Sequence, residues 1–282
     1  MKLMEPYSLN NKPMVLAQIT DSHLFSSVDG LHHGYNVLEN LRKVLLSICG
    51  NPAIKYIIFT GDLTQDHTEQ SYQNFVDCVL ECKITVPIYY LAGNHDEPEL
   101  LDKYFSVSPF QADKEINLSH WQVQLVDSKS ATPAGYVSEQ ALGKLEDTIK
   151  EDKHQLLMMH HHPIDVGYFI DQHGLQNKEA FWQAINGYSN IKAIACGHVH
   201  GDMRLTNPLT KLSNKPLDKS LSQQLNPKLT KDKEPVILYT CPATSIQFDP
   251  SVDGVAALAK GPGYRLFYLY ADGQLSTDVV TL

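Results

Sequence analysis

Four consecutive residues, Gly93, Asn94, His95 and Asp96, carry groups suited to chemistry and follow an apolar run at residues 88–91. An asparagine can offer a neutral oxygen to a metal, a histidine can exchange a proton near neutral pH, and an aspartate can orient a neighbouring group. In α/β enzymes, polar residues of these types at the end of a buried strand are typical of an active site. The tetrapeptide therefore predicts a functional site.

Ligand-type residues also follow four other apolar runs, each with the length and composition of a buried strand. They are Asp21 and His23 after residues 14–19, Asp62 after 56–59, His160, His161 and His162 after 155–159, and His198 and His200 after 191–196. A single histidine at a strand end is more often structural, but five such ends in one chain predict a metal or catalytic site. Imidazole nitrogens with carboxylate and amide oxygens, and no thiolate, favour Mn, Fe, Co or Zn in an open catalytic site.

The elements that must position these residues alternate in type along the first part of the chain. Strands at 14–19, 56–59 and 88–91 are separated by amphipathic helices at 36–49 and 69–82. This order predicts an α/β fold with parallel strands joined by right-handed crossovers.

The rest of the chain continues with both kinds of element and one segment of different composition. We expect hairpin strands at 116–118 and 121–126, helices at 138–151 and 177–185, and strands at 155–159, 191–196, 236–240, 245–248, 264–270 and 275–281. Residues 205–235 are rich in Asn, Lys, Ser and Pro, and we interpret them as a surface insertion in a single domain spanning 1–282. A cap or dimer arm near the site is the alternative interpretation of this insertion.

Composition and charge narrow the class of protein. The chain is 43% hydrophobic and 20% charged, which is ordinary for a globular protein, and its formal net charge of −9 argues against a protein that coats nucleic acid or an anionic membrane. An anionic small-molecule substrate stays compatible with this charge, because bound metal ions reverse the local field. The sequence shows no signal peptide or membrane span, and its five scattered cysteines indicate a reduced, cytoplasmic protein.

Five motifs follow one another along the chain: Asp21-x-His23, Gly61-Asp62, Gly93-Asn94-His95-Asp96, His161-x-Pro163 and Gly197-His198-x-His200. In these motifs and in their order, the chain resembles the calcineurin-like metallophosphoesterases. The triple histidine before Pro163, Asp171-Gln172-His173 and residues 244–248 further resemble the bacterial class III cyclic-nucleotide phosphodiesterases. The resemblance implies an α/β fold, a four-layer αββα sandwich of two β-sheets, with a dimetal site at the carboxyl ends of the strands.

The resemblance also implies a role for individual residues. Asp21, His23 and His200 would bind the first metal ion, Asn94, His161 and His198 the second, and Asp62 would bridge the two. The family's His-x-Pro pattern selects His161, while a shift of one residue would select a neighbouring histidine. His95 and Asp62 would be catalytic, and the implied substrate contacts are Asn94, His95, His200, His173 and Gln247. Fe or Mn would be the metals, with Zn or Co as alternatives.

The implied reaction is hydrolysis of 3′,5′-cyclic AMP to 5′-AMP by in-line attack of a hydroxide that bridges two metal ions. A metallophosphoesterase of broader specificity is the alternative, because the motifs specify activation of phosphorus and not what is attached to it. An inactive interaction scaffold is disfavoured, since all seven ligand positions and His95 are present. The sequence leaves open whether the chain forms a homodimer.

Some polar residues near these motifs receive other interpretations. Asp96 either orients His95 through a hydrogen bond or caps a turn. We expect His32, His33, His67, His120 and His154 to face solvent.

Overall fold

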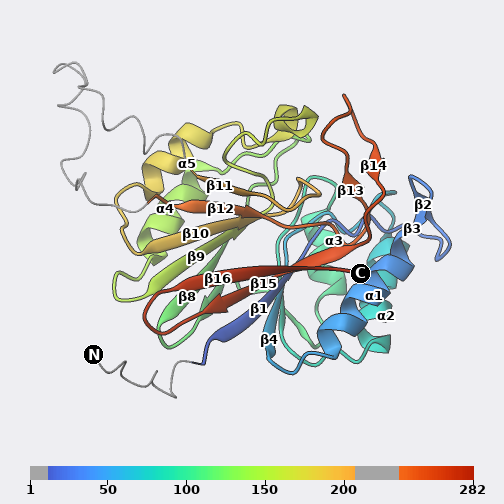
Figure 1. The fold of residues 1–282 in the computed structure, drawn as a ribbon, viewed down its shortest axis with the longest axis horizontal. Coiled ribbons are helices and arrows are strands. Elements are labelled where there is room, and N and C mark those ends of the chain that lie inside the picture. The colour runs from blue at the N-terminus through green and yellow to red at the C-terminus, as the bar shows by residue number, and fades with distance from the viewer. Residues whose placement is uncertain (1–11, 207–234) are drawn as a thin grey trace, which may run out of the picture.

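The computed structural model describes residues 12–206 and 235–282, and two six-stranded β-sheets packed face to face form its centre (Figure 1). The strand order is β16-β15-β1-β4-β5-β6 in the first sheet and β11-β12-β10-β9-β8-β7 in the second. Each sheet therefore combines strands that are distant in sequence.

Parallel strands from the first part of the chain and two C-terminal strands form the first sheet. Its strands are β1 (Met14–Ile19), β4 (Ile54–Phe59), β5 (Ile88–Tyr90), β6 (Phe110–Gln111), β15 (Gly263–Leu269) and β16 (Leu275–Thr281). The first four run parallel, and β15 pairs antiparallel with both β1 and β16. The helices that pack against this sheet are α1 (Val37–Cys49), α2 (Glu69–Glu81) and α3 (Pro98–Tyr104). The alternation of strands and helices predicted from the sequence is confirmed.

The second sheet has a parallel centre with shorter antiparallel strands at its edges. Its strands are β7 (Glu115–Asn117), β8 (Trp121–Val126), β9 (His154–Met159), β10 (Ile191–Cys196), β11 (Arg204–Thr206) and β12 (Ile237–Thr240). The four strands β8, β9, β10 and β12 run parallel. Helices α4 (Glu139–Thr148) and α5 (Lys178–Ile185) pack against this sheet.

Apolar side chains fill three layers, one between the two sheets and one between each sheet and its helices. Leu16 and Ile58 of the first sheet meet Val123 and Leu156 of the second, and all four are fully buried. Burial of such side chains is worth about 1.5–3 kcal/mol each. The three cores confirm the expected four-layer αββα sandwich.

Several short elements were not predicted because each is too brief to show a periodic pattern. They are the hairpin β2 (Leu31–His32) and β3 (Tyr35–Asn36), the 3₁₀ helix η1 (Phe169–His173), and β14 (Ala257–Leu258), which pairs with β13 (Gln247–Phe248). Residues 207–234, most of the expected insertion, lie outside the described residues. Within the described part of the chain, no helix combines the length and apolar character needed to cross a membrane.

Backbone hydrogen bonds join the loops that follow the parallel strands. The amide of Asp21 donates to Gly61 O at 2.8 Å, and the amide of Thr244 donates to Thr20 O at 2.9 Å. A Cβ on Gly197 would overlap the hydroxyl of Thr20, so glycine permits the loops after β10 and β1 to meet. The predicted ligand residues are thereby gathered at one end of the sandwich.

Candidate metal centre

Strained backbone occurs at five of the seven residues that the sequence predicted as ligands. Asp21, His23, Asp62, His198 and His200 all have positive φ, between 46° and 66°. A residue with a side chain adopts this left-handed conformation at a cost of about 1–3 kcal/mol, and such strain concentrates at functional sites. The loops thus hold these side chains in positions that the backbone alone disfavours.

Asp21, His23 and His200 form the first cluster of ligand-type groups. His200 Nε2 lies 3.1 Å from His23 Nε2 and 3.3 Å from Asp21 Oδ1, and all three side chains are buried. His200 Nδ1 donates a hydrogen bond to Ile246 O at 2.8 Å, so the lone pair of Nε2 faces the cluster. Two imidazole nitrogens facing each other beside a carboxylate are the donor set of a cation site.

His160, Asn94 and His198 form a second cluster beside the first. His160 Nε2 lies 3.1 Å from Asn94 Oδ1, while His160 Nδ1 donates to Thr60 O at 2.7 Å. The ring of His198 lies 5.0 Å from that of His160, centroid to centroid, and its buried Nε2 has no hydrogen-bond partner among the described residues. A buried nitrogen without a partner is costly unless a ligand satisfies it, so this cluster also fits a cation.

Asp62 lies between the two clusters. Its Oδ2 is 3.7 Å from His23 Nε2 in the first cluster and 3.4 Å from His160 Nε2 in the second. Its Oδ1 accepts a hydrogen bond from the backbone amide of His95 at 2.9 Å, which fixes the orientation of the carboxylate. The arrangement suits a single oxygen shared by two cations, and the residues present therefore fit two metal ions.

Charges around Asp62 favour its ionised form. Burial alone would raise the pKa of this carboxyl, but the neighbouring imidazoles, His160 first, hold it well below its usual range. Burial likewise would lower the pKa of His160, yet the Asp62 carboxylate raises it to about 9. The centre of the site is thus a buried carboxylate in its ionised form, which is the form that binds a cation.

The structure separates the three histidines of the 160–162 run by their hydrogen-bond partners. Both ring nitrogens of His161 face other groups, Ser128 Oγ at 2.8 Å and Pro133 O at 3.2 Å. His161 is close enough to His160 and His198 to belong to the same group of ligand atoms, but His160 is the one that faces Asp62 and Asn94. Both histidines therefore stay candidate ligands, and the selection of His161 by the sequence pattern stays a prediction.

Of the two roles expected for Asp96, the hydrogen bonds agree with the capping of backbone N–H groups and not with a contact to His95. Its carboxylate accepts three backbone hydrogen bonds, from Asp62 at 2.8 Å, Leu63 at 2.8 Å and Gly93 at 2.9 Å. Asp96 therefore joins the loop after β4 to the loop after β5. A Cβ on Gly93 would overlap the Asp62 carboxylate, so this close approach also requires glycine.

One histidine expected to face solvent, His32, lies against the site instead, and His67 is exposed as expected but borders the site. The ring of His32 packs edge-on against His23 at 5.2 Å, and burial lowers the pKa of His32 to about 4. His67 is exposed, but its ring stacks on that of His95, with centroids 5.5 Å apart and an interplanar angle of 6°. No periodic pattern could have placed these residues, because His32 lies in the two-residue strand β2 and His67 in an irregular loop.

The two outer substrate contacts implied by the resemblance behave differently from the residues at the centre. The buried amide of Gln247 accepts from Ala243 N and donates to Ala243 O and Gly261 O, so both of its N–H groups are used within the protein. Gln247 is thus held by hydrogen bonds to its own loop, and its implied role as a substrate contact stays a prediction. His173 ends η1 and is partly exposed, without a hydrogen bond to any ligand residue.

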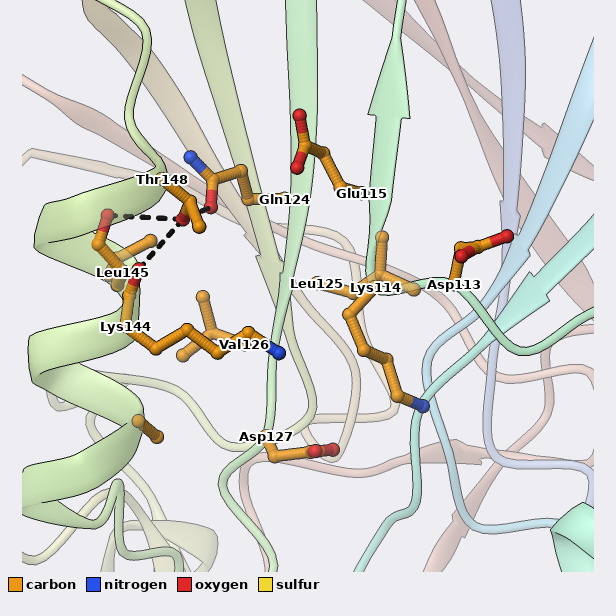
Figure 2. Close-up of a pocket in the computed structure, with 11 residues that line it drawn as sticks. Asp113, Lys114, Glu115, Gln124, Leu125, Val126, Asp127, Lys144, Leu145 and Thr148 are labelled. Atoms are coloured by element: carbon orange, nitrogen blue, oxygen red, sulfur yellow. Dashed lines mark hydrogen bonds between the residues drawn. The ribbon is translucent and has the colours of Figure 1, made fainter.

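Another pocket lies away from these clusters, between α4 and the β7–β8 hairpin (Figure 2). It measures about 260 Å³, and Lys114, Asp127 and Lys144 are among its lining residues. Thr148 on its wall donates to Gln124 and also contacts backbone oxygens of α4. The pocket contains none of the clustered histidines, so the metal centre stays the candidate site.

Comparison with known proteins agrees with this geometry. The family described as calcineurin-like phosphoesterase matches residues 14–202. A "Probable cyclic nucleotide phosphodiesterase" of Colwellia psychrerythraea (strain 34H) is 78% identical over the full length of both chains. The 3′,5′-cyclic adenosine monophosphate phosphodiesterase CpdA of Vibrio vulnificus (strain CMCP6) is 31% identical, covering 98% of this chain and 92% of its own.

A solved structure has the same fold at low sequence identity. The dimetal phosphatase LOC 393393 of Danio rerio superposes with a TM-score of 0.60 at 13% identity, over 95% of this chain and 99% of its own. At this identity the likeness shows the fold alone.

Proposed function

Because the chain belongs to the calcineurin-like phosphoesterase family and is a hydrolase, we propose that it hydrolyses 3′,5′-cyclic AMP to 5′-AMP with two transition-metal ions. The position of Asp62 Oδ2 between two donor clusters is the observation that carries the two-metal part of the proposal. The names of the relatives support the cyclic nucleotide as the substrate.

The proposed ligand sets share one residue. The first ion would be held by Asp21, His23, His200 and Asp62, and the second by Asn94, His160, His198 and Asp62. We assign His160 in place of His161, because His160 Nε2 faces Asp62 and Asn94, whereas the nitrogens of His161 face Ser128 and Pro133 outside the two ligand sets. Nitrogen and oxygen donors without sulfur favour Fe or Mn, and Zn or Co are compatible with them.

When bound, the two ions would polarise the phosphate and acidify the attacking water molecule. Asp62 sets the spacing of the two ligand sets, and the backbone amide of His95 holds Asp62 in place. Asn94 completes its set without adding negative charge, which leaves the site attractive to an anionic phosphate.

His95 would act on the bond that breaks. In the conversion of 3′,5′-cyclic AMP to 5′-AMP, the P–O3′ bond breaks and O3′ must gain a proton. The ring of His95 packs edge-on against His23 at 4.9 Å and is only partly buried, so it borders the ligand sets and can be reached by a substrate. Burial lowers the pKa of His95. A neutral imidazole still carries one N–H, and His95 can therefore stabilise the departing oxygen as a hydrogen-bond donor.

The substrate assignment can be tested with one metal-loaded preparation. We would remove metals by chelation, reload with Mn(II) or Fe(II), and offer 3′,5′-cyclic AMP, 3′,5′-cyclic GMP, 2′,3′-cyclic AMP, bis(4-nitrophenyl) phosphate and 4-nitrophenyl phosphate. We expect 3′,5′-cyclic AMP to give 5′-AMP with the highest kcat/KM of the panel. If cyclic AMP stays intact while the other esters are hydrolysed rapidly, the assignment of cyclic AMP as the substrate is wrong. The broader phosphoesterase would then take its place.

A separate variant addresses the inactive scaffold. Asp62→Ala should abolish hydrolysis and lower the metal content, since both ligand sets lose their shared oxygen. Unchanged activity and metal content in this variant would remove the two-metal proposal.

The cytoplasm is the compartment we propose, because the five cysteines are free.

A further inference from the structure

The turn at residues 168–173, which contains η1, contacts the loop after β10 that carries His198 and His200. The hydroxyl of Tyr168 donates a hydrogen bond to Val199 O, between the two histidines of that loop. The same turn supplies two further chains of contact, one toward His198 and one toward His200. Both pass through a residue that lies outside the proposed ligand sets.

The first chain of contact begins at Asp171. Its carboxylate accepts hydrogen bonds from His162 Nε2 at 3.1 Å, from Val166 N at 2.7 Å and from Gly167 N at 2.8 Å. Burial would raise the pKa of Asp171, but these donors, His162 first, lower it, so the carboxylate is ionised near neutral pH. The turn therefore holds a charged acceptor against the edge of the His162 ring.

His162 in turn packs against His198. Its buried ring stacks on that of His198, with centroids 5.8 Å apart and an interplanar angle of 23°. The position of His162 is tightly defined from the other side, because a Cβ on Gly174 would lie 2.8 Å from His162 Nε2. Rotation of His162 would therefore remove a neighbour against which the His198 ring packs.

The second chain of contact runs through two phenylalanines. Phe169 packs on Phe248 at 5.4 Å, and Phe248 stacks on His200 with centroids 3.8 Å apart and an interplanar angle of 3°. The backbone of Phe248 also donates to His200 O at 3.0 Å. His200 is thus held by an aromatic face on one side and by the hydrogen bond from its Nδ1 to Ile246 O.

We propose that the turn at 168–173 is a positioning element for the metal centre, in which Asp171 orients His198 through His162 and Phe169 orients His200 through Phe248. This inference rests on the two-metal function proposed above. It assigns a role to the Asp171-Gln172-His173 stretch, but through Asp171 and not through His173. It also predicts that the two ligand sets can be weakened one at a time.

The test compares Asp171→Ala with Asp165→Ala in the full chain. Asp165 lies in the same loop, but its carboxylate is exposed and pairs only with Lys178 at the surface. We would titrate metal-free protein with Mn(II), following heat of binding and the electron paramagnetic resonance signal of paired Mn(II). Residues that orient metal ligands typically change metal affinity by about 10–100-fold.

We expect Asp171→Ala to lower the affinity for one of the two ions by at least about tenfold and to leave the other within about twofold. Asp165→Ala should match the unmodified protein. Phe248→Leu should also lower the affinity for one ion. The double variant Asp171→Ala/Phe248→Leu should lower the affinity for both ions. His162→Gln, which keeps a donor for Asp171, should retain more affinity than His162→Ala.

Unchanged affinity for both ions in Asp171→Ala would overturn the inference, as would an equal loss at both sites. If Asp171→Ala does not fold, the comparison of His162→Gln with His162→Ala decides by the same criterion. The unmodified protein keeps the two proposals distinguishable. Binding of fewer than two ions to it contradicts the proposed function itself, whereas two ions there and two ions bound with unchanged affinity in Asp171→Ala contradict only the positioning role.

Discussion

The backbone amide of Asp62 donates a hydrogen bond to Asp96 Oδ2 at 2.8 Å, although the two residues follow different strands. The same carboxylate also accepts from the amides of Leu63 and Gly93. Asp96 therefore holds the loop that carries Asp62 against the loop that carries Asn94. Its side chain is fully buried, so no water can replace these contacts cheaply.

Asp96→Ala should destabilise the protein and displace Asp62. Three buried amides would lose their acceptor, and each unsatisfied group costs about 1–3 kcal/mol, so we expect the free energy of unfolding to fall by about 3 kcal/mol or more. Urea unfolding of metal-free protein measures this change, and kcat/KM for cyclic AMP measures the displacement of Asp62. In the background of His95→Ala, Asp96→Ala should still lower both quantities. If its effect disappeared there, Asp96 would be acting through the His95 ring.

Gly93→Ala should impair the site through one methyl group. The added Cβ would overlap Asp62 Oδ1 and press on the Asp62 backbone, so the shared carboxylate must move. We expect kcat/KM to fall by about a hundredfold, since a displacement of about 1 Å at a reacting centre has an effect of that size.

Gly143→Ala is the matched control for this substitution. Gly143 lies in α4 with open space where its Cβ would point, so alanine should raise the free energy of unfolding by about 0.5–1 kcal/mol without changing kcat/KM. Equal activity of the two variants would show that the space beside Asp62 is not limiting.

The sheet and the site could be predicted from the sequence to different depths. Apolar runs such as residues 14–19 and 191–196 are long enough to show as strands, and the ligand-type residues directly after them mark the edge of the sheet that forms the site. These signals are local, so the expected fold agreed with the structure. The hairpin β2–β3 and η1 have no such pattern, because they are short and their conformation depends on contacts with distant loops.

The direction of an individual side chain depends on partners that the sequence does not show. His160 turns toward Asp62 because Thr60 O, 100 residues away, accepts from its Nδ1, while Ser128 and Pro133 hold His161. The family pattern could select the run but could not identify these acceptors. Gln247 is a similar case, since its backbone partners at Ala243 and Gly261 become evident only in the fold.

Substitutions of His160 and His161 test which of the two histidines binds a metal ion. His160→Ala should leave about one metal ion per chain and lower kcat/KM by about a hundredfold or more, because a ligand to the second ion is lost. His161→Gln should keep two ions, since an amide can still hydrogen-bond to Ser128 or Pro133. Metal analysis of the purified variants gives the answer. A metal loss confined to His161→Gln would restore the assignment that the sequence pattern favoured.

Metal binding should depend on pH through His160. Burial lowers the pKa of this imidazole, but Asp62 raises it to about 9, so the metal-free protein carries a proton there near neutral pH. Nε2 can bind a cation only after that proton leaves. We expect the affinity for one ion to rise by about tenfold for each pH unit from neutral pH toward about pH 9, with release of about one proton.

Calorimetry in buffers of different ionisation enthalpy counts the protons released from His160, and exposed His120→Gln is the matched control variant. The same raised pKa stabilises the metal-free fold fully below about pH 6.5, and this contribution is lost as the pH rises through about 9. Metal-free His160→Gln should therefore lose less stability between neutral pH and pH 9 than the unmodified protein. If the metal affinity does not change over this range, His160 is already neutral in the metal-free protein. Asp62 would then not raise the pKa of His160.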